Sequence, residues 1–416
     1  MSRHEPIMTS TPNIFLSAGE ASGELYGAML IEAVRAARPD ARFFGLGGKA
    51  METAGCECVV RTEDIAVMGI TEVLRHMPRI YGEYRRLLRS IRARKPDVAV
   101  LIDFPDVNFR LARELKKLGV PVLYFVSPQL WAWKQYRVRW VRERVSKMLV
   151  IFPFEEKYYR EHGVDVEFVG HPLADLPLPS ISRQDFANRH GLDPSKEWIG
   201  LLPGSRAKEL RHNLPVMIAA ANLLGKSYEY VLPAAATLDP EWIQMMVAQS
   251  RPAQHGAGVA IRVVKDARAT LYHARASVVA SGTATVEAAL IGNPFIAVYR
   301  LSKFSYAVAS RLVDLPHVAM ANLIAGKRIV PELIQEEFTA ERVASSLQPL
   351  LEESDARLNM IRELAGARNA LCRDADGGLD AKKMTAIDRA SEWVLRFLNG
   401  ASSASMASHP EPHVHV

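Results

Sequence analysis

The chain has 416 residues, of which 49% are hydrophobic and 24% charged, so it can bury a substantial core and we expect a globular protein of two or three domains. Its three cysteines, Cys56, Cys58 and Cys372, lack the number and spacing of a disulfide framework or a zinc site, which favours a reducing compartment. The polar first thirteen residues predict no signal peptide. No run reaches the roughly 18 apolar residues that would predict a membrane-spanning helix.

Short apolar runs alternate with amphipathic stretches along the chain. In the first half the runs fall at 13–19, 41–48, 97–105, 121–128, 147–154 and 166–172. A proline-rich linker at about 172–182 interrupts the pattern, which restarts with runs at 198–205, 228–235, 259–266, 276–283 and 294–300. Apolar runs joined by helices are typical of parallel sheets covered on both faces. The pattern therefore predicts two doubly wound α/β domains in tandem.

The expected domain boundaries follow from the linker and from the end of the periodic pattern. We expect an N-terminal domain at 1–175 and a C-terminal domain at 183–375. We expect helices from about 339 to 398, with the helix at 376–398 returning to the first domain, and a disordered tail at 399–416. The histidines of this tail, at 409, 413 and 415, are a weaker candidate for a metal site.

The first loop of the predicted fold is SAGEASGE, residues 17–24, between a strand and a helix. In doubly wound sheets ligands bind at such loops, beyond the carboxyl ends of the strands. The small residues let a ligand approach the backbone, while Glu20 supplies an acceptor and Ser22 a donor. The same stretch also fits a tight turn in which a serine or glutamate caps the helix, and both interpretations stay open.

A later loop, DFPDVNFRLA at 103–112, places Asp103, Asp106 and Asn108 after a very apolar strand. A carboxylate there is poorly solvated, so its pKa is expected to rise toward the range of a general base. The structural alternative is a helix cap, and we expect one of the two aspartates to play that part. No cluster of further ligands supports a metal site at this pair.

Two loops of the second half predict contacts with a nucleotide. LLPGSRAKEL, at 201–210, places Gly204, Ser205 and Arg206 where a strand meets a helix. Backbone N–H groups at a helix N-terminus bind phosphate, and an arginine adds a charge-assisted contact. The loop lacks the Lys-Ser/Thr ending of a Walker A motif.

The second such loop is SGTATVEAAL at 281–290, with Ser281, Gly282 and Thr283 at the strand end and Glu287 in the helix. A buried glutamate there suits a ribose diol, because both hydroxyls can donate to one carboxylate. The alternative is a helix of small residues that packs closely on the sheet. By contrast, GLGG at 45–48 lacks the full Gly-x-Gly-x-x-Gly pattern and gives little support to a dinucleotide site.

Basic residues gather in two stretches. Residues 75–95 hold eight Arg or Lys against one acid, and 134–147 hold six, with three tryptophans around them. The first stretch fits an anionic membrane surface, and we expect the membrane-facing residues to include Met68, Ile70, Arg85, Arg86 and Arg89. Each stretch also fits a solvated helix face, and the second fits phosphate contacts and base stacking in a nucleic-acid-binding protein.

Taken in order, these motifs resemble the lipid-A-disaccharide synthase family of bacterial glycosyltransferases. The resemblance spans about 13–342 and includes SAGEASGE, GLGG, DFPDVNFRLA, SPQLWAWKQYRVRWV, FPFE, VGHPLAD, LLPGSRAKEL, SGTATVEAAL and ANLIAGKRIVPELIQ. It implies a GT-B fold, with two Rossmann-like domains facing across a cleft. It also implies condensation of UDP-2,3-diacylglucosamine with 2,3-diacylglucosamine 1-phosphate to give UDP and the β-1',6-linked disaccharide of lipid A.

The resemblance also implies residue roles. Asp103 matches the family's essential aspartate and would deprotonate the acceptor's 6-hydroxyl, while Arg206 and Glu287 match contacts to diphosphate and ribose. Asn322 and Gln335 match polar positions near the donor. Inversion at the anomeric carbon implies direct displacement without a covalent intermediate, and no cofactor or metal is expected.

Two positions depart from the family pattern, Glu24 where aspartate is usual and Ala321 where proline is common. Neither removes a charge, so the activity is still expected. The implied lipid substrates favour a protein peripheral to the cytoplasmic face of the inner membrane, with a homodimer as an option and no nucleic-acid partner.

Three alternative functions each fit part of the sequence. A UDP-N-acetylglucosamine epimerase would use the same phosphate and ribose loops but would need no lipid-facing surface. A nucleic-acid-binding protein would leave both nucleotide loops unexplained. An oxidoreductase would rest on GLGG alone.

Overall fold

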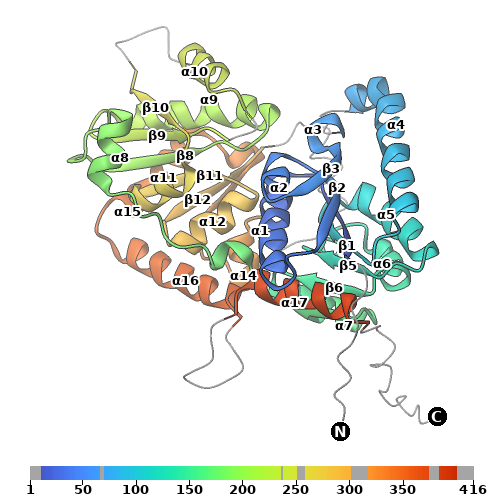
Figure 1. Ribbon diagram of the computed structural model, residues 1–416. Coiled ribbons are helices and arrows are strands. Elements are labelled where there is room, and N and C mark those ends of the chain that lie inside the picture. Colours follow the sequence, from blue (N-terminus) through green and yellow to red (C-terminus); the bar gives the residue numbers. More distant parts are fainter. Residues whose placement is uncertain are drawn as a thin grey trace, which may run out of the picture. The chain divides into compact units, whose positions relative to one another are not determined.

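A computed structural model of the chain describes residues 11–65, 70–235, 238–250, 258–300, 317–373 and 384–400. The chain divides into two compact units (Figure 1). Unit 1 combines Met1–Pro172 with Arg373–Val416, and unit 2 is Leu173–Cys372. The C-terminal segment thus belongs with the first unit.

Unit 1 is built on a seven-stranded sheet in which every strand pair is parallel. The order is β3-β2-β1-β4-β5-β6-β7. The strands are β1 (Asn13–Ala18), β2 (Arg42–Gly47), β3 (Cys56–Arg61), β4 (Val98–Ile102), β5 (Val122–Phe125), β6 (Lys147–Val150) and β7 (Val166–Phe168). β4, β5 and β6 are buried along their whole length, as expected for central strands with helices on both faces.

The helices of unit 1 join successive strands and cover the two faces of the sheet. They are α1 (Ala21–Ala37), α2 (Lys49–Thr53), α3 (Thr62–Ile65), α4 (Ile70–Arg94), α5 (Pro105–Lys117), α6 (Val138–Arg144), α7 (Pro153–Glu161) and α17 (Ala386–Leu398), with 3₁₀ turns at Gln135–Arg137 and, at the boundary with unit 2, Pro172–Ala174. α17 packs against α1, although more than 300 residues separate them in the sequence (Figure 1). Glu167 anchors the segment that contains α17, accepting hydrogen bonds from Arg373 Nη1 at 2.7 Å and Trp393 Nε1 at 2.9 Å.

Unit 2 repeats the design with a six-stranded parallel sheet in the order β10-β9-β8-β11-β12-β13. Its strands are β8 (Trp198–Leu202), β9 (Glu229–Pro233), β10 (Ile261–Val264), β11 (Ala276–Ala280), β12 (Phe295–Tyr299) and β13 (Glu332–Ile334). Its described helices are α8 (Arg183–His190), α9 (Ala207–Leu224), α10 (Pro240–Gln249), α11 (Ala267–His273), α12 (Thr283–Ile291), α14 (Met320–Ala325), α15 (Ala340–Leu351) and α16 (Asp355–Leu371), with a 3₁₀ turn at Gln335–Glu337.

The predicted fold class, two parallel α/β units, is confirmed. All eleven apolar runs contain a strand, but the sequence analysis missed the edge strands β3 and β13. β3 carries exposed polar residues, and β13 has only three residues. Neither strand shows the continuous apolar run of a central strand. Within the described residues, no helix has the length and hydropathy to cross a membrane.

The strand order reverses once in each sheet, and this point places the predicted site. β1 lies beside β4, with Ala18 opposite Ile102, and β8 lies beside β11, with Leu202 opposite Val279. At such a switch point the flanking connections leave in opposite directions and open a crevice beyond the strand ends. The loops that follow these four strands are the four motifs singled out from the sequence, two in each unit.

Candidate active site

Asp103 follows the last residue of β4 in an unusual backbone conformation. Its φ is 45° and that of Phe104 is 47°, so two successive non-glycine residues adopt left-handed conformations, each at a cost of about 1–3 kcal/mol. Two side chains hold this turn through the Asp103 carbonyl: Tyr124 Oη donates to it at 2.6 Å and Asn108 Nδ2 at 2.7 Å. The half-buried Asp103 is thus presented at the strand end by a fixed backbone.

Asn108 ties the two strands of the switch point together. It is completely buried, accepts a hydrogen bond from Ser17 Oγ at 2.6 Å and also donates to the carbonyl of Ile102 at 3.2 Å. Asn108 was predicted as a residue of the acceptor site or of the active-site loop. The structure places it in α5, where its buried side chain bonds Ser17, Ile102 and Asp103.

The expectation that Asp103 or Asp106 caps the following helix is wrong. The N-cap of α5 is Phe104, whose side chain has no acceptor, and Pro105 occupies the first helical position. Asp106 lies in the first turn and pairs with Arg137, Oδ1 to Nη2 at 2.9 Å. Neither aspartate therefore occupies the N-cap position.

The loop after β1 is small because Phe104 lies against it. A Cβ on Gly19 would lie 2.3 Å from the Phe104 ring, so no other residue fits without a shift. Glu20 is exposed at the N-cap position of α1, and its side chain makes no capping hydrogen bond. Ser22 is half-buried in the first turn. Both side chains lie at the carboxyl edge of the sheet, as the sequence predicted.

Glu155 is a buried carboxyl group that the sequence analysis did not single out. It accepts hydrogen bonds from Trp131 Nε1 at 3.1 Å and from the backbone N–H of Phe152 at 3.3 Å. Burial, and to a smaller extent the negative charge of Asp103, raises the pKa of Glu155 to about 8, although the hydrogen bonds from Trp131 and the backbone oppose the rise. The available signal was FPFE, in which Glu155 stands three residues after the N-cap Phe152 and accepts its backbone N–H, as in a capping box.

In unit 2, the phosphate loop predicted at 203–206 leads into α9 and is filled by a carboxylate of the chain itself. Glu209 Oε2 accepts from the backbone N–H of Ser205 at 2.9 Å and of Arg206 at 3.3 Å, while Arg206 Nη1 donates to Glu209 Oε1 at 3.2 Å. Gly204, at φ 123°, makes this possible, since a Cβ there would lie 2.3 Å from Glu209 Oε2. These N–H groups are the donors expected to meet a phosphate.

The other predicted loop of unit 2 leads into α12. Gly282, with φ 143°, is the exposed N-cap, Thr283 is exposed, and Ser281 Oγ donates to the carbonyl of Val318 at 3.2 Å. Glu287 lies in the second turn of α12 and pairs with Arg268 at 3.6 Å. Burial raises the pKa of Glu287, whereas the charge of Arg268 lowers it. Arg268 was not singled out from the sequence.

Asn322 is buried and all its hydrogen-bonding capacity is used. Its Oδ1 accepts from the N–H groups of Ile329 and Val330 at 2.7 and 2.9 Å, and its Nδ2 donates to the Val330 carbonyl and Glu332 Oε1 at 3.0 and 2.7 Å. An amide can make two bonds of each kind, so none remains for a ligand. Asn322 thus fixes the 317–330 segment, together with Glu332, which accepts from the Val318 and Ala319 N–H groups.

Gln335 is buried in a left-handed conformation, φ 53°, and its carbonyl accepts a hydrogen bond from Arg300 Nη2 at 3.1 Å.

On α4, the side chains of Arg85, Arg86 and Arg89 are exposed, as expected. Met68, the side chain of Ile70 and the tail histidines lie outside the described residues. In the part of the chain that is described, no three His, Cys, Asp or Glu side chains are grouped to hold a metal ion.

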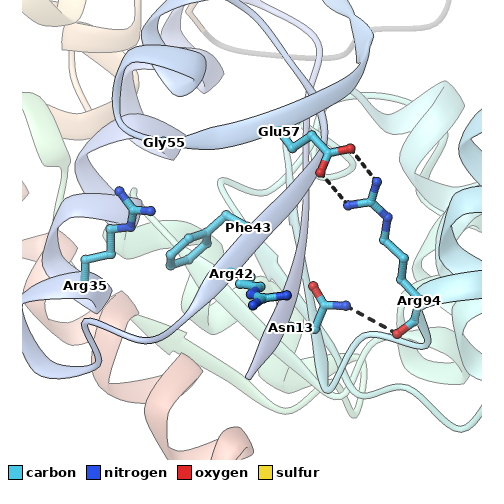
Figure 2. A pocket seen from close by; sticks show the side chains of 7 residues that line it. All are labelled: Asn13, Arg35, Arg42, Phe43, Gly55, Glu57 and Arg94. Carbon is cyan, nitrogen blue, oxygen red and sulfur yellow. Dashed lines mark hydrogen bonds and ion pairs between the residues drawn. The ribbon is translucent and has the colours of Figure 1, made fainter. Parts of the chain in front are cut away.

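Two surface cavities flank the sheet of unit 1. One, of about 450 Å³, lies where β1 and β2 begin (Figure 2) and is lined by Asn13, Arg35, Arg42, Phe43, Gly55, Glu57 and Arg94. Figure 2 shows Arg94 paired with Glu57 across this cavity, which is at the opposite strand ends from Asp103. The other, of about 390 Å³, lies beside Asp106 at the predicted site.

Comparison with known proteins gives one consistent family. A family model described as lipid-A-disaccharide synthetase matches residues 14–371. The lipid-A-disaccharide synthase of Acidobacterium capsulatum is 62% identical over 371 residues, covering 88% of this chain and 93% of that protein. The corresponding protein of Koribacter versatilis is 52% identical over 360 residues, covering 86% and 93%.

Solved structures with low sequence identity share the fold. The UDP-GlcNAc 2-epimerase of Neisseria meningitidis, solved bound to UDP-GlcNAc, has a TM-score of 0.58 at 12% identity and covers 93% of this chain and 100% of its own. The calicheamicin glycosyltransferase CalG4 has a TM-score of 0.55 at 15% identity, covering 94% and 98%. The GT-B class predicted from the sequence is thereby confirmed.

The elevated pKa of Glu155 predicts a pH-dependent stability that Glu155→Gln removes. The ordinary pKa of the group is 4.5. Between pH 4.5 and about pH 8, the folded state therefore keeps a proton on Glu155 that the unfolded state has lost. Stability should therefore fall as pH rises through this window, by up to about 1.4 kcal/mol per pH unit. Denaturant unfolding of both proteins from pH 5 to 9 measures the difference. Parallel pH profiles for the two proteins would contradict the assigned pKa.

Proposed function

Because the chain belongs to the lipid-A-disaccharide synthetase family, we propose that it condenses UDP-2,3-diacylglucosamine with 2,3-diacylglucosamine 1-phosphate. The products would be UDP and the β-1',6-linked disaccharide 1-phosphate of lipid A. The observation that carries the proposal is the placement of family motifs at both switch points. A carboxylate follows β4 in unit 1, and two helix N-termini with an arginine follow β8 and β11 in unit 2.

On the acceptor side, Asp103 is the proposed general base. Its backbone is held by Tyr124 and Asn108, so its position does not depend on the ligand. The nearby Glu155 is largely protonated at neutral pH, which limits competition for the proton. Glu20, Ser22 and Asp106 would contact the acceptor from the same edge of the sheet.

On the donor side, Arg206 and the N-termini of α9 and α12 would bind the diphosphate. The N–H groups of Ser205 and Arg206 already hold the carboxylate of Glu209. A phosphate would take its place, and Glu209 would have to turn away. Ser281, Gly282 and Thr283 would line the second N-terminus.

The carboxylate of Glu287 would accept a hydrogen bond from each of the two ribose hydroxyls. Asn322 and Gln335 would act indirectly by fixing the segments beside this site, since the first has no free hydrogen-bonding capacity and the second is buried.

The proposed step is a direct displacement. The acceptor's 6-oxygen bonds to the anomeric carbon and passes its proton to Asp103. The bond from that carbon to the UDP oxygen breaks, and its electron pair leaves with UDP. Negative charge grows on the diphosphate, where Arg206 and the oriented N–H groups stabilise it more strongly than in the ground state. Attack from the face opposite UDP inverts the α-linked donor to a β-linked product.

The function is tested by incubating the purified chain with UDP-2,3-diacylglucosamine, with and without the monosaccharide phosphate. UDP and disaccharide should form only when both are present. Conversion of UDP-N-acetylglucosamine to its 2-epimer without an acceptor would favour the epimerase alternative instead. This alternative is considered because the chain shares its fold with the epimerase of Neisseria meningitidis, at 12% identity.

Asp103→Asn should lower turnover by at least about 10²- to 10⁴-fold, because it keeps the shape but cannot take the proton. The affinity for UDP, measured by calorimetry, should hardly change. Arg206→Ala should weaken UDP binding and slow turnover together. Asp355→Asn, in the first turn of α16, serves as a control without effect. Near-normal turnover of Asp103→Asn would move the base to Glu20 or Asp106.

Turnover should survive excess EDTA. Arg206 and two helix N-termini supply the positive charge that a metal ion would otherwise bring to the diphosphate. Rates measured before and after chelation, then with added magnesium, make the comparison. A loss that magnesium restores would contradict metal-independent transfer and would assign Asp103 and Asp106 to a metal.

We further propose that α4 binds the anionic surface of the inner membrane from the cytoplasm. Arg85→Glu with Arg89→Glu should weaken binding to phosphatidylglycerol vesicles while leaving UDP affinity intact, since each charge near such a surface contributes about 1 kcal/mol. Binding of the wild type should fall as salt rises. Vesicle sedimentation measures it, with Lys157→Glu and Arg160→Glu on the exposed face of α7 as the matched control. Equal loss for both pairs would remove α4 from the membrane surface.

A further inference from the structure

The cavity beside Asp106 is basic and partly aromatic. It lies among α4, α5 and α6, and its volume is about 390 Å³. Its lining comprises Tyr84, Pro105, Asp106, Phe109, Arg110, Arg113, Glu114, Arg137, Trp140 and Arg144. None of the roles proposed above uses its arginines.

Positive charge in this cavity exceeds negative charge. Four arginines face two acids, and Glu114 is already paired with Arg92 and Lys117. Arg110 and Arg113 have no acidic partner among the described residues. Burial lowers the pKa of Arg144, and the charge of Arg113 lowers it further, although Glu143 opposes this. The cavity therefore favours an anion.

Arg137 supplies an unused donor. Its side chain is only 11% exposed, and one guanidinium nitrogen pairs with Asp106 at 2.9 Å. Its Nε is buried without a hydrogen-bond partner in the described part of the chain, which adds to the cost of burying this guanidinium. The Trp140 ring lies 5.5 Å from the guanidinium carbon of Arg137 and 5.0 Å from that of Arg144, so an aromatic wall adjoins the charge.

The spacing along α5 connects this cavity to Asp103. Phe109 and Arg110 lie three and four residues after Asp106, and Arg113 lies three residues after Arg110, so these side chains share one face of the helix, which starts directly after the Asp103–Phe104 turn. At 1.5 Å per residue, Arg110 lies about 7.5 Å along the axis from Pro105, the first residue of the helix. A single sugar ring can bridge this kind of distance.

We propose that this cavity binds the phosphate monoester of the acceptor sugar, with Arg110, Arg113 and Arg137 as its ligands. The inference rests on the proposed function, because it takes a sugar whose 6-hydroxyl meets Asp103 and whose anomeric phosphate lies across the ring. Arginine suits this group through its paired N–H donors. The site would thus select a phosphorylated acceptor and orient it for attack.

The test compares phosphorylated and unphosphorylated acceptors in neutral detergent micelles. Arg110→Gln with Arg113→Gln should raise KM for the phosphorylated acceptor, diacylglucosamine 1-phosphate, at least about tenfold. The KM values for unphosphorylated diacylglucosamine and for the UDP-sugar should stay unchanged. Arg142→Gln, on the exposed side of α6 and outside the cavity, is the matched control and should behave as wild type. Thermal melting confirms that each variant is folded.

Two outcomes would overturn the inference. An equal rise in KM for both acceptors would mean that the arginines do not recognise phosphate. An effect seen only when phosphatidylglycerol is added to the micelles would assign them to lipid headgroups.

A binding experiment without turnover separates this inference from the proposed function. Glucosamine 1-phosphate, the water-soluble core of the acceptor, is titrated against the wild type and the double variant and followed by phosphorus NMR. Binding to the wild type and not to the double variant supports the phosphate site, even if no disaccharide forms and the proposed function fails. Equal binding to both proteins, or to neither, would overturn the site.

Discussion

The left-handed turn at Asp103 and Phe104 is the constraint on which the first unit's site depends. Two such residues together cost several kcal/mol, and the bonds from Tyr124 and Asn108 to the Asp103 carbonyl help to offset this cost. The same turn places the Phe104 ring where a side chain at position 19 would otherwise lie. One strained turn therefore explains a glycine in the loop after β1, a buried asparagine in α5 and a tyrosine in β5.

In the second unit, the groups at the strand ends are backbone N–H donors, which need acceptors. Its helix N-termini carry N–H donors at the strand ends, and the carboxylate of Glu209 accepts from two of them. In the proposed donor complex a phosphate would replace this carboxylate, and one set of charge-assisted hydrogen bonds would replace another. In the same unit, Asn322 and Glu332 hold the 317–330 segment through hydrogen bonds to its backbone and to each other. In both units, buried side chains such as Asn108 and Asn322 hold the backbone of the segments beside the strand ends.

The sequence predicted the central strands and the four loops at the switch points because both have local signals. An apolar run marks a buried strand, and small or polar residues mark its end. The edge strand β3 carries Glu57 and Arg61 on its exposed positions and so lacks the run. The expected cap by Asp103 or Asp106 was wrong because the left-handed turn passes the N-cap position to Phe104, and φ is not written in a local pattern.

Residues that contact the candidate site from distant positions in the sequence have no such local signal. Glu155 reaches Trp131 across 24 positions, and Arg137 reaches Asp106 across 31, which only the strand order brings together. Glu209 was within reach, since a glutamate three residues after an N-cap is a known capping signal.

The sequence likewise does not reveal that two arginines of the second basic stretch share a cavity with two arginines of α5. In the folded unit, Tyr84 from the first stretch and Arg137, Trp140 and Arg144 from the second line one cavity with α5. A solvated helix face would leave such arginines dispersed in water, whereas here the side chain of Arg137 is nearly nine-tenths buried. Burying a guanidinium is costly unless an anion compensates it, and Asp106 occupies only part of its donors. Arg137 and Arg144 of the second stretch are therefore better explained by the cavity than by a solvated helix face, because an anion bound there would balance charge that the chain leaves uncompensated.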